Sequence, residues 1–80
     1  MNDTQNTNQP TELVVVDARG FACPEPVMMA RSALIRNKDR PVRVLVDTAT
    51  AKDNLLRLAG REKRAAEAHE EGNAWLVLFE

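Results

Sequence analysis

Residues 13–27 read LVVVDARGFACPEPV, a β-branched run followed by a short loop and two closely spaced prolines. The run 13–17 is typical of a strand buried in a sheet. A turn follows at Arg19-Gly20, because Gly20 can adopt a positive φ. A helix is predicted from about residue 24 to residue 38, since prolines fit a first turn whose N–H groups have no intrahelical partner.

Cys23 is the only cysteine of the chain, and the pattern places it at the helix N-cap, with Pro24 and Pro26 at the first and third helical positions. Free N–H groups and the positive end of the helix dipole meet there and favour a thiolate, the reactive form of cysteine. The prolines stiffen the turn, and Glu25 adds an opposing negative charge. We therefore expect a modestly activated thiol on a rigid support.

The next elements continue the alternation of strand and helix. Residues 42–47 form a second predicted strand, and Thr48 or Thr50 is expected to cap a second helix, with Thr50 and Asp53 resembling a capping box. Apolar residues at helical spacing predict the buried faces. These are Val27, Ala30 and Leu34, widened by Met28 and Ile35, in the first helix, and Ala51, Leu55, Leu58 and Ala59 in the second.

Residues 62–71 fit two structures. Their Ala, Glu, Lys and Arg content favours a helix that continues past Gly60, whereas Ala66 and Ala68 alternate with polar residues as in a half-buried edge strand. A turn at 71–73 and a final strand at 74–79 follow. Taken alone, these residues leave the structure of 62–71 open.

Length and composition limit the class of protein. The 80 residues suit one small domain, predicted over 13–80 after a disordered polar tail at 1–12. There is no long apolar run and no signal-peptide pattern, and a lone cysteine offers no intrachain disulfide, so we expect a cytoplasmic protein. A net charge of −1, with two Phe and one Trp, argues against a nucleic-acid binder.

Residues 17–29 resemble the signature of the TusA/SirA/YedF-like sulfur-carrier family, whose hallmark is Cys-Pro-x-Pro at the start of the first helix. Residues 44–47 (VLVD) and 51–54 (AKDN) resemble the YedF-like branch in particular. The resemblance covers residues 13–80. It implies an α/β fold of order β-α-β-α-β-β, an α+β two-layer sandwich with a four-stranded mixed sheet, two helices on one face, and a strand within 62–71.

The resemblance also implies an activity. Cys23 would accept sulfane sulfur as a persulfide from a cysteine desulfurase or rhodanese-like donor, and would pass it to an acceptor protein. We expect a monomer without cofactor, bound metal, nucleic acid or membrane partner. Cys23 alone carries over as a catalytic residue. The supporting motif residues are Pro24, Glu25 and Pro26 at the helix entry and Asp17, Arg19 and Gly20 in the approach loop.

Other interpretations of Cys23 also fit the residues. It could be a buried structural cysteine, a Cu(I) ligand with Met28 or Met29, or the partner of His69 in a catalytic pair. The chain could also be a non-catalytic regulatory module that uses the thiol for redox sensing. Persulfide loading by a donor enzyme separates that module from a carrier.

Overall fold

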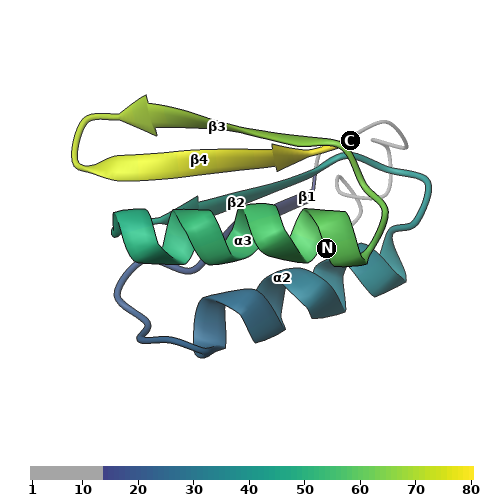
Figure 1. The fold of residues 1–80 in the computed structure, drawn as a ribbon, viewed down its shortest axis with the longest axis horizontal. Coiled ribbons are helices and arrows are strands. Elements are labelled where there is room, and N and C mark those ends of the chain that lie inside the picture. The colour runs from purple at the N-terminus through teal and green to yellow at the C-terminus, as the bar shows by residue number, and fades with distance from the viewer. Residues whose placement is uncertain (1–13) are drawn as a thin grey trace, which may run out of the picture.

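The computed structural model describes residues 14–80, so the polar segment 1–12 and Leu13 of the first predicted strand lie outside the described residues. The element order is β-α-β-α-β-β, as predicted (Figure 1). Within 14–80, neither helix has the length and apolar character needed to cross a membrane. The elements are β1 (Val14–Asp17), α2 (Glu25–Arg36), β2 (Val42–Val46), α3 (Ala49–Arg61), β3 (Ala66–Glu71) and β4 (Ala74–Phe79).

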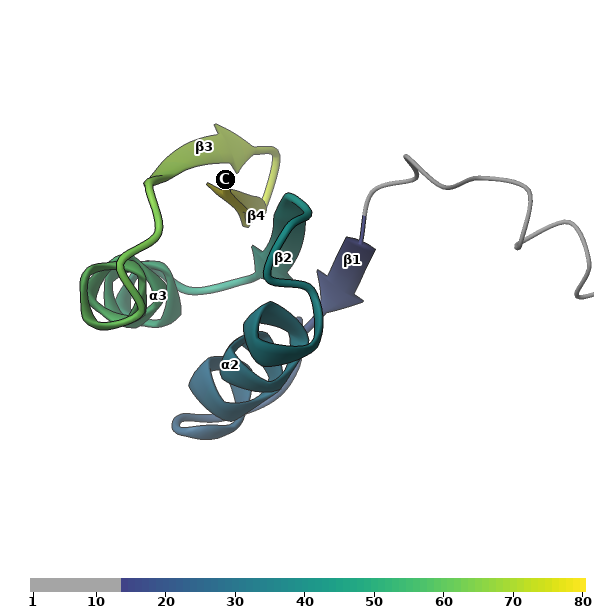
Figure 2. The ribbon, with the colours of Figure 1, turned by 90° about the vertical axis from the view of Figure 1, so that its right-hand side faces the viewer.

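The four strands form one mixed sheet in the order β1-β2-β4-β3. β1 and β2 are parallel and joined through α2, whereas β4 pairs antiparallel with both β2 and β3. Figure 2 shows α2 and α3 on the same side of the sheet, which confirms the predicted two-layer sandwich. Because β1 and β2 run in the same direction, the loops that enter α2 and α3 meet at one end of the molecule (Figure 1).

The core fills the space between the helices and one face of the sheet. Val42, Val44 and Val46 alternate along β2 and are completely buried, as the period of a strand requires when one face is covered. The predicted buried face of α3 is confirmed. Its buried residues are Ala51, Leu55, Leu58 and Ala59.

The buried face of α2 differs in part from the prediction. Ala30 and Leu34 are buried as expected, but Met28 and Ile35 are 60% and 46% exposed. At 3.6 residues per turn, positions 28 and 35 lie on the side of the helix opposite positions 30 and 34. Met29 packs against the core in place of Met28. The predicted widening of the buried face by Met28 and Ile35 is therefore wrong.

Helix α3 shows which capping signals act. Of the two predicted caps, Thr48 is the N-cap, and its hydroxyl accepts a hydrogen bond from the Ala51 N–H at 3.1 Å. The Thr50–Asp53 capping box does not form, because Thr50 lies inside the helix, two positions after the N-cap. Asp53 pairs with Lys52 at 2.6 Å.

The segment after α3 resolves the ambiguity over 62–71 in favour of a strand. The helix passes Gly60 and is closed by Lys63, which has φ 59°, while the Arg64 N–H donates to Ala59 O at 2.9 Å; this is the pattern of a Schellman motif. β3 then places Ala66 and Ala68 against the core, paired with Phe79 and Val77 of β4.

Candidate functional site

Cys23 lies in a tight turn just before α2, and its side chain is exposed. The Glu25 N–H donates to Ala22 O at 2.9 Å and closes the turn, in which the Cys23–Pro24 peptide bond is cis. The N-cap of α2 is Pro24, whose carbonyl accepts the Met28 N–H at 3.1 Å. The prediction that Cys23 is the N-cap is therefore wrong by one residue.

The reason for the shift is the turn itself. Its closing hydrogen bond uses the carbonyl of Ala22, so regular helical geometry begins only after Pro24. Pro26 consequently occupies the second helical position, where a missing N–H still costs no helical hydrogen bond. Its ring is fully buried. The turn thus presents the sulfur outward while Pro26 anchors the helix entry in the core, and the exposure of Cys23 excludes a buried structural cysteine.

The approach loop is fixed to the sheet by two carboxylates. Asp17 accepts bonds from the Arg19 guanidinium at 2.8 Å through each carboxylate oxygen, and from the Arg19 backbone N–H at 3.2 Å. Asp47, which follows β2, accepts the Gly20 N–H at 3.0 Å. Gly20 has φ 86°, a conformation that glycine adopts without steric cost. The predicted loop residues therefore hold the backbone that leads to Cys23.

The ion pair in this loop changes the acidity of Asp17. The side-chain hydrogen bonds from Arg19 are the main cause that lowers the pKa of Asp17 to about 2, and the backbone N–H of Arg19 adds to it. The same contacts raise the pKa of Arg19. Both side chains are half exposed, so solvent screens the energy of the pair.

A second helix supplies the contact to the sulfur. Asn54 of α3 donates from Nδ2 to Cys23 Sγ at 3.8 Å, and Arg57 donates to Asn54 Oδ1 at 2.9 Å. Neither residue was assigned to the site from the sequence, because they lie more than 30 positions from Cys23. A signal was present in Asn54 itself, since asparagine is a weak helix former in the middle of a predicted helix.

Two other side chains make contacts away from Cys23: Lys52 of α3 and His69, the residue considered as a catalytic partner of Cys23. Lys52 lies over the ring of Trp75 at 4.7 Å and pairs with Asp53. His69, on the edge strand β3, lies 3.4 Å from Glu67. Between Val14 and Glu80, no three His, Cys, Asp or Glu side chains gather closely enough to hold a metal ion.

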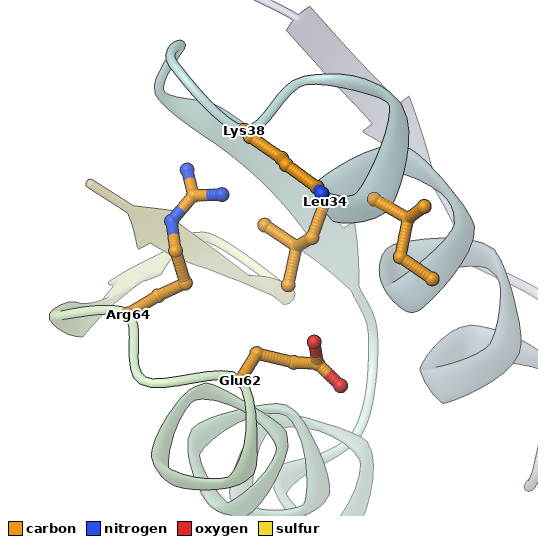
Figure 3. A pocket seen from close by; sticks show the side chains of 5 residues that line it. Leu34, Lys38, Glu62 and Arg64 are labelled. Carbon is orange, nitrogen blue, oxygen red and sulfur yellow. The ribbon is translucent and has the colours of Figure 1, made fainter.

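Two hollows on the surface of residues 14–80 lie away from Cys23. One of about 260 Å³ lies between the C-terminal ends of α2 and α3, and Figure 3 shows Leu34, Lys38, Glu62 and Arg64 around it. Another shares Lys38 and is bordered by Arg43 and Leu78. Because Cys23 precedes the N-terminus of α2, it lies on an exposed turn at the opposite end of that helix from these hollows.

Comparisons with known proteins bear on the family and the fold. The family model described as sulfurtransferase TusA matches residues 14–80. The crystal structure of the SirA-like protein from Desulfitobacterium hafniense aligns with a TM-score of 0.77 and 29% identity, covering 82% of this chain and 93% of that one. A search of curated proteins found no match. Since the family model covers all the described elements, the chain belongs to the TusA sulfurtransferase family.

Proposed function

We propose that this protein carries sulfane sulfur as a persulfide on Cys23, relaying it from a donor enzyme to an acceptor protein. The observation that carries the proposal is the exposed sulfur on a braced turn, in a member of the TusA family. An exposed thiol can meet the persulfide of another protein without rearrangement of the core. The donor is a cysteine desulfurase or a rhodanese-like enzyme, and the protein acts as a monomer.

The transfer is a thiol exchange and requires no outside oxidant. The Cys23 thiolate attacks the outer sulfur of the donor's persulfide, a new S–S bond forms at Cys23, and the donor's S–S bond breaks. The electron pair of that bond leaves with the donor cysteine as a thiolate. The acceptor later attacks the outer sulfur on Cys23, and the Cys23 thiolate is regenerated.

The single cysteine suits a carrier. A second thiol nearby would attack the persulfide and discharge it as a disulfide, and this chain has no other cysteine. The cargo can then leave only through an external nucleophile. Asp17, Arg19 and Gly20 support the relay by holding the loop ahead of Cys23, and Pro26 supports it by anchoring α2.

The YedF-like branch is the part of the family we propose for this chain. The support comes from residues 44–47 and 51–54, which carry the resemblance to that branch. Asp47 and Asn54, the last residues of these two segments, both contact the Cys23 region, through Gly20 and through the sulfur respectively. A lone exposed thiol also fits a reducing compartment, which favours a cytoplasmic relay.

Sulfur loading tests the proposal. The full chain is incubated with cysteine and a cysteine desulfurase, or with a rhodanese-like enzyme and its donor, and the intact mass is measured. We expect a gain of one sulfur atom per chain, mapped to the peptide with Cys23 and absent from Cys23→Ser. An unchanged mass across a panel of both donor classes contradicts the proposed function.

A further inference from the structure

The hydrogen bond to Cys23 is part of a short chain of three side chains. Asn54 Nδ2 lies 3.8 Å from Cys23 Sγ, a length that suits the large sulfur atom, and Arg57 donates to Asn54 Oδ1 at 2.9 Å. Arg57 follows Asn54 by three positions, so both lie on the same face of α3. An exposed cation is thereby connected, through one amide, to the sulfur.

Arg57 determines which end of the Asn54 amide faces Cys23. A guanidinium has only N–H donors, so the oxygen of the amide must face Arg57. The NH₂ group of Asn54 then faces the sulfur, and one of its N–H bonds can donate to Sγ. Such a donor stabilises an anionic sulfur more than a neutral thiol, because hydrogen bonds to charged acceptors are the stronger ones.

We propose that Asn54 stabilises the anionic sulfur of Cys23 and its persulfide, and that Arg57 is the positioning residue that orients the Asn54 amide. The part that concerns the persulfide rests on the proposed function. The outer sulfur of a persulfide lies roughly 2 Å from Sγ, because that is the length of an S–S bond. Rotation about the Cβ–Sγ bond can therefore bring it to the same amide.

The presence of asparagine at position 54 is not explained by the stability of α3. The helix already has its N-cap at Thr48, and asparagine in a helix interior costs stability relative to alanine. Lys52, another cation on α3, is held by Asp53 and the ring of Trp75. Arg57 is thus the cation that the described contacts connect to the sulfur.

Five single variants and the double variant Asn54→Ala/Arg57→Ala of the full chain test the proposal. Asn54→Ala removes the donor, and Asn54→Asp keeps the shape but puts a carboxylate beside the sulfur. Arg57→Ala releases the amide, whereas Arg57→Lys keeps a donor for the amide oxygen. Arg61→Ala is the matched control, because Arg61 is an exposed arginine one turn further along α3 and its removal makes the same charge change. Circular dichroism confirms that each variant is folded.

The main measurement is the rate of Cys23 alkylation by iodoacetamide as a function of pH. We expect Asn54→Ala to raise the pH at which alkylation becomes fast, because a hydrogen bond that stabilises the anionic sulfur is lost. Asn54→Asp should raise it further. Arg57→Ala should give a smaller rise, restored by Arg57→Lys, and should add nothing in the Asn54→Ala background.

Sulfur uptake from inorganic polysulfide gives a second readout without a donor protein. The Cys23 thiolate attacks a sulfane sulfur, an S–S bond of the polysulfide breaks, and the shortened polysulfide leaves with the electron pair. We expect this rate at neutral pH to fall about three- to tenfold in Asn54→Ala, in proportion to the lost thiolate.

The outcomes separate this proposal from the proposed function. An Asn54→Ala profile that superposes on the wild type overturns the role of Asn54, even if donor enzymes load Cys23 normally. Equal shifts in Arg57→Ala and Arg61→Ala overturn the positioning role, because general electrostatics would then explain both. The expected shifts in a protein that no donor enzyme loads support the role of Asn54 at the sulfur and contradict only the relay.

Discussion

Asp17 and Arg19 form an ion pair in the loop that leads to Cys23, and its effect depends on pH. The Arg19 hydrogen bonds lower the pKa of Asp17 from 3.8 to about 2 in the folded protein. A group whose pKa is depressed by folding stabilises the native state above its unfolded pKa. This contribution is therefore complete above about pH 4 and is lost as the pH falls through about 2.

Removal of the Arg19 side chain should return the pKa of Asp17 towards 3.8. In Arg19→Ala the main cause of the shift is gone, while the backbone N–H of Arg19 can still donate. NMR titration of the Asp17 carboxyl carbon measures this directly. Arg31→Ala, which removes an exposed arginine paired with Glu62 instead, should leave the titration unchanged. An unaltered Asp17 titration in Arg19→Ala would contradict the assignment.

At the level of single residues, the sequence identifies the thiol but not its partner. Cys23 and its two prolines stand in one short motif, and their placement after a strand predicts a presented sulfur. Asn54 reaches that sulfur only because α2 and α3 pack side by side, a relation that local spacing does not contain. The predicted N-cap is wrong for a local reason, because the Ala22 carbonyl accepts the hydrogen bond that closes the turn around Cys23.

At the level of elements, helix faces and ends differ in how well they can be predicted. The stripe of α3 follows from its spacing, because charged and apolar residues separate cleanly there. In α2 the apolar residues are not confined to one face, since Met28 and Ile35 lie on the solvent side. The end of α3 is not predictable from its residues, because Lys63 closes the helix with a positive φ, a conformation that lysine rarely adopts.

Two substitutions at the end of α3 should each stabilise the protein. Lys63→Gly should raise the free energy of unfolding by about 0.5–1 kcal/mol, because glycine adopts the left-handed conformation without steric cost. Gly60→Ala should raise it by a similar amount, about 0.5–1 kcal/mol, because Gly60 is helical and a Cβ there meets nothing within 4 Å. Urea unfolding measures both. A loss of stability in Gly60→Ala would show that Gly60, and not Lys63, ends the helix.

At the level of the whole molecule, the two ends of the helix layer carry different contacts. The end with Cys23 holds the exposed turn and the loop contacts. At the other end, Arg64 donates to Glu80 O and to Arg40 O, both at 2.7 Å. These bonds connect the segment after α3 to the residue that follows β4 and to the loop before β2. The sequence shows Arg64 only as part of a basic cluster, because these carbonyl partners are brought together by the fold.

Arg64→Ala should weaken the fold without affecting the thiol. Loss of two charge-assisted bonds at a partly solvated site should lower the free energy of unfolding by about 1–2 kcal/mol. Alkylation of Cys23 should keep its wild-type rate, because Arg64 lies beyond the C-terminal ends of the two helices whereas the turn with Cys23 lies at their N-terminal ends. Arg64→Lys should recover only part of the stability, since one ammonium cannot reproduce the planar fork. A slower alkylation in a folded Arg64→Ala would contradict this separation.

The strand β3 depends on the whole molecule for its formation. Its composition favours a helix, and the resemblance to the family, not propensity, predicts a strand. In the structure, Ala66 and Ala68 pair with Phe79 and Val77 and pack against the core. Strand formation follows from such packing more than from intrinsic preference. The residues of this segment alone therefore do not predict a strand.

Release of thiocyanate by cyanide tests most directly whether Cys23 carries sulfane sulfur. A mass gain alone is ambiguous, because one sulfur atom and two oxygen atoms have the same nominal mass, and a redox sensor oxidised to the sulfinic acid would show the same gain. After loading by a donor enzyme and removal of that donor, cyanide is added and thiocyanate is measured. We predict one thiocyanate per loaded chain, return of the protein to its original mass, and no thiocyanate from Cys23→Ser. A mass gain that persists through cyanide and dithiothreitol would show an oxidised cysteine and contradict the carrier function.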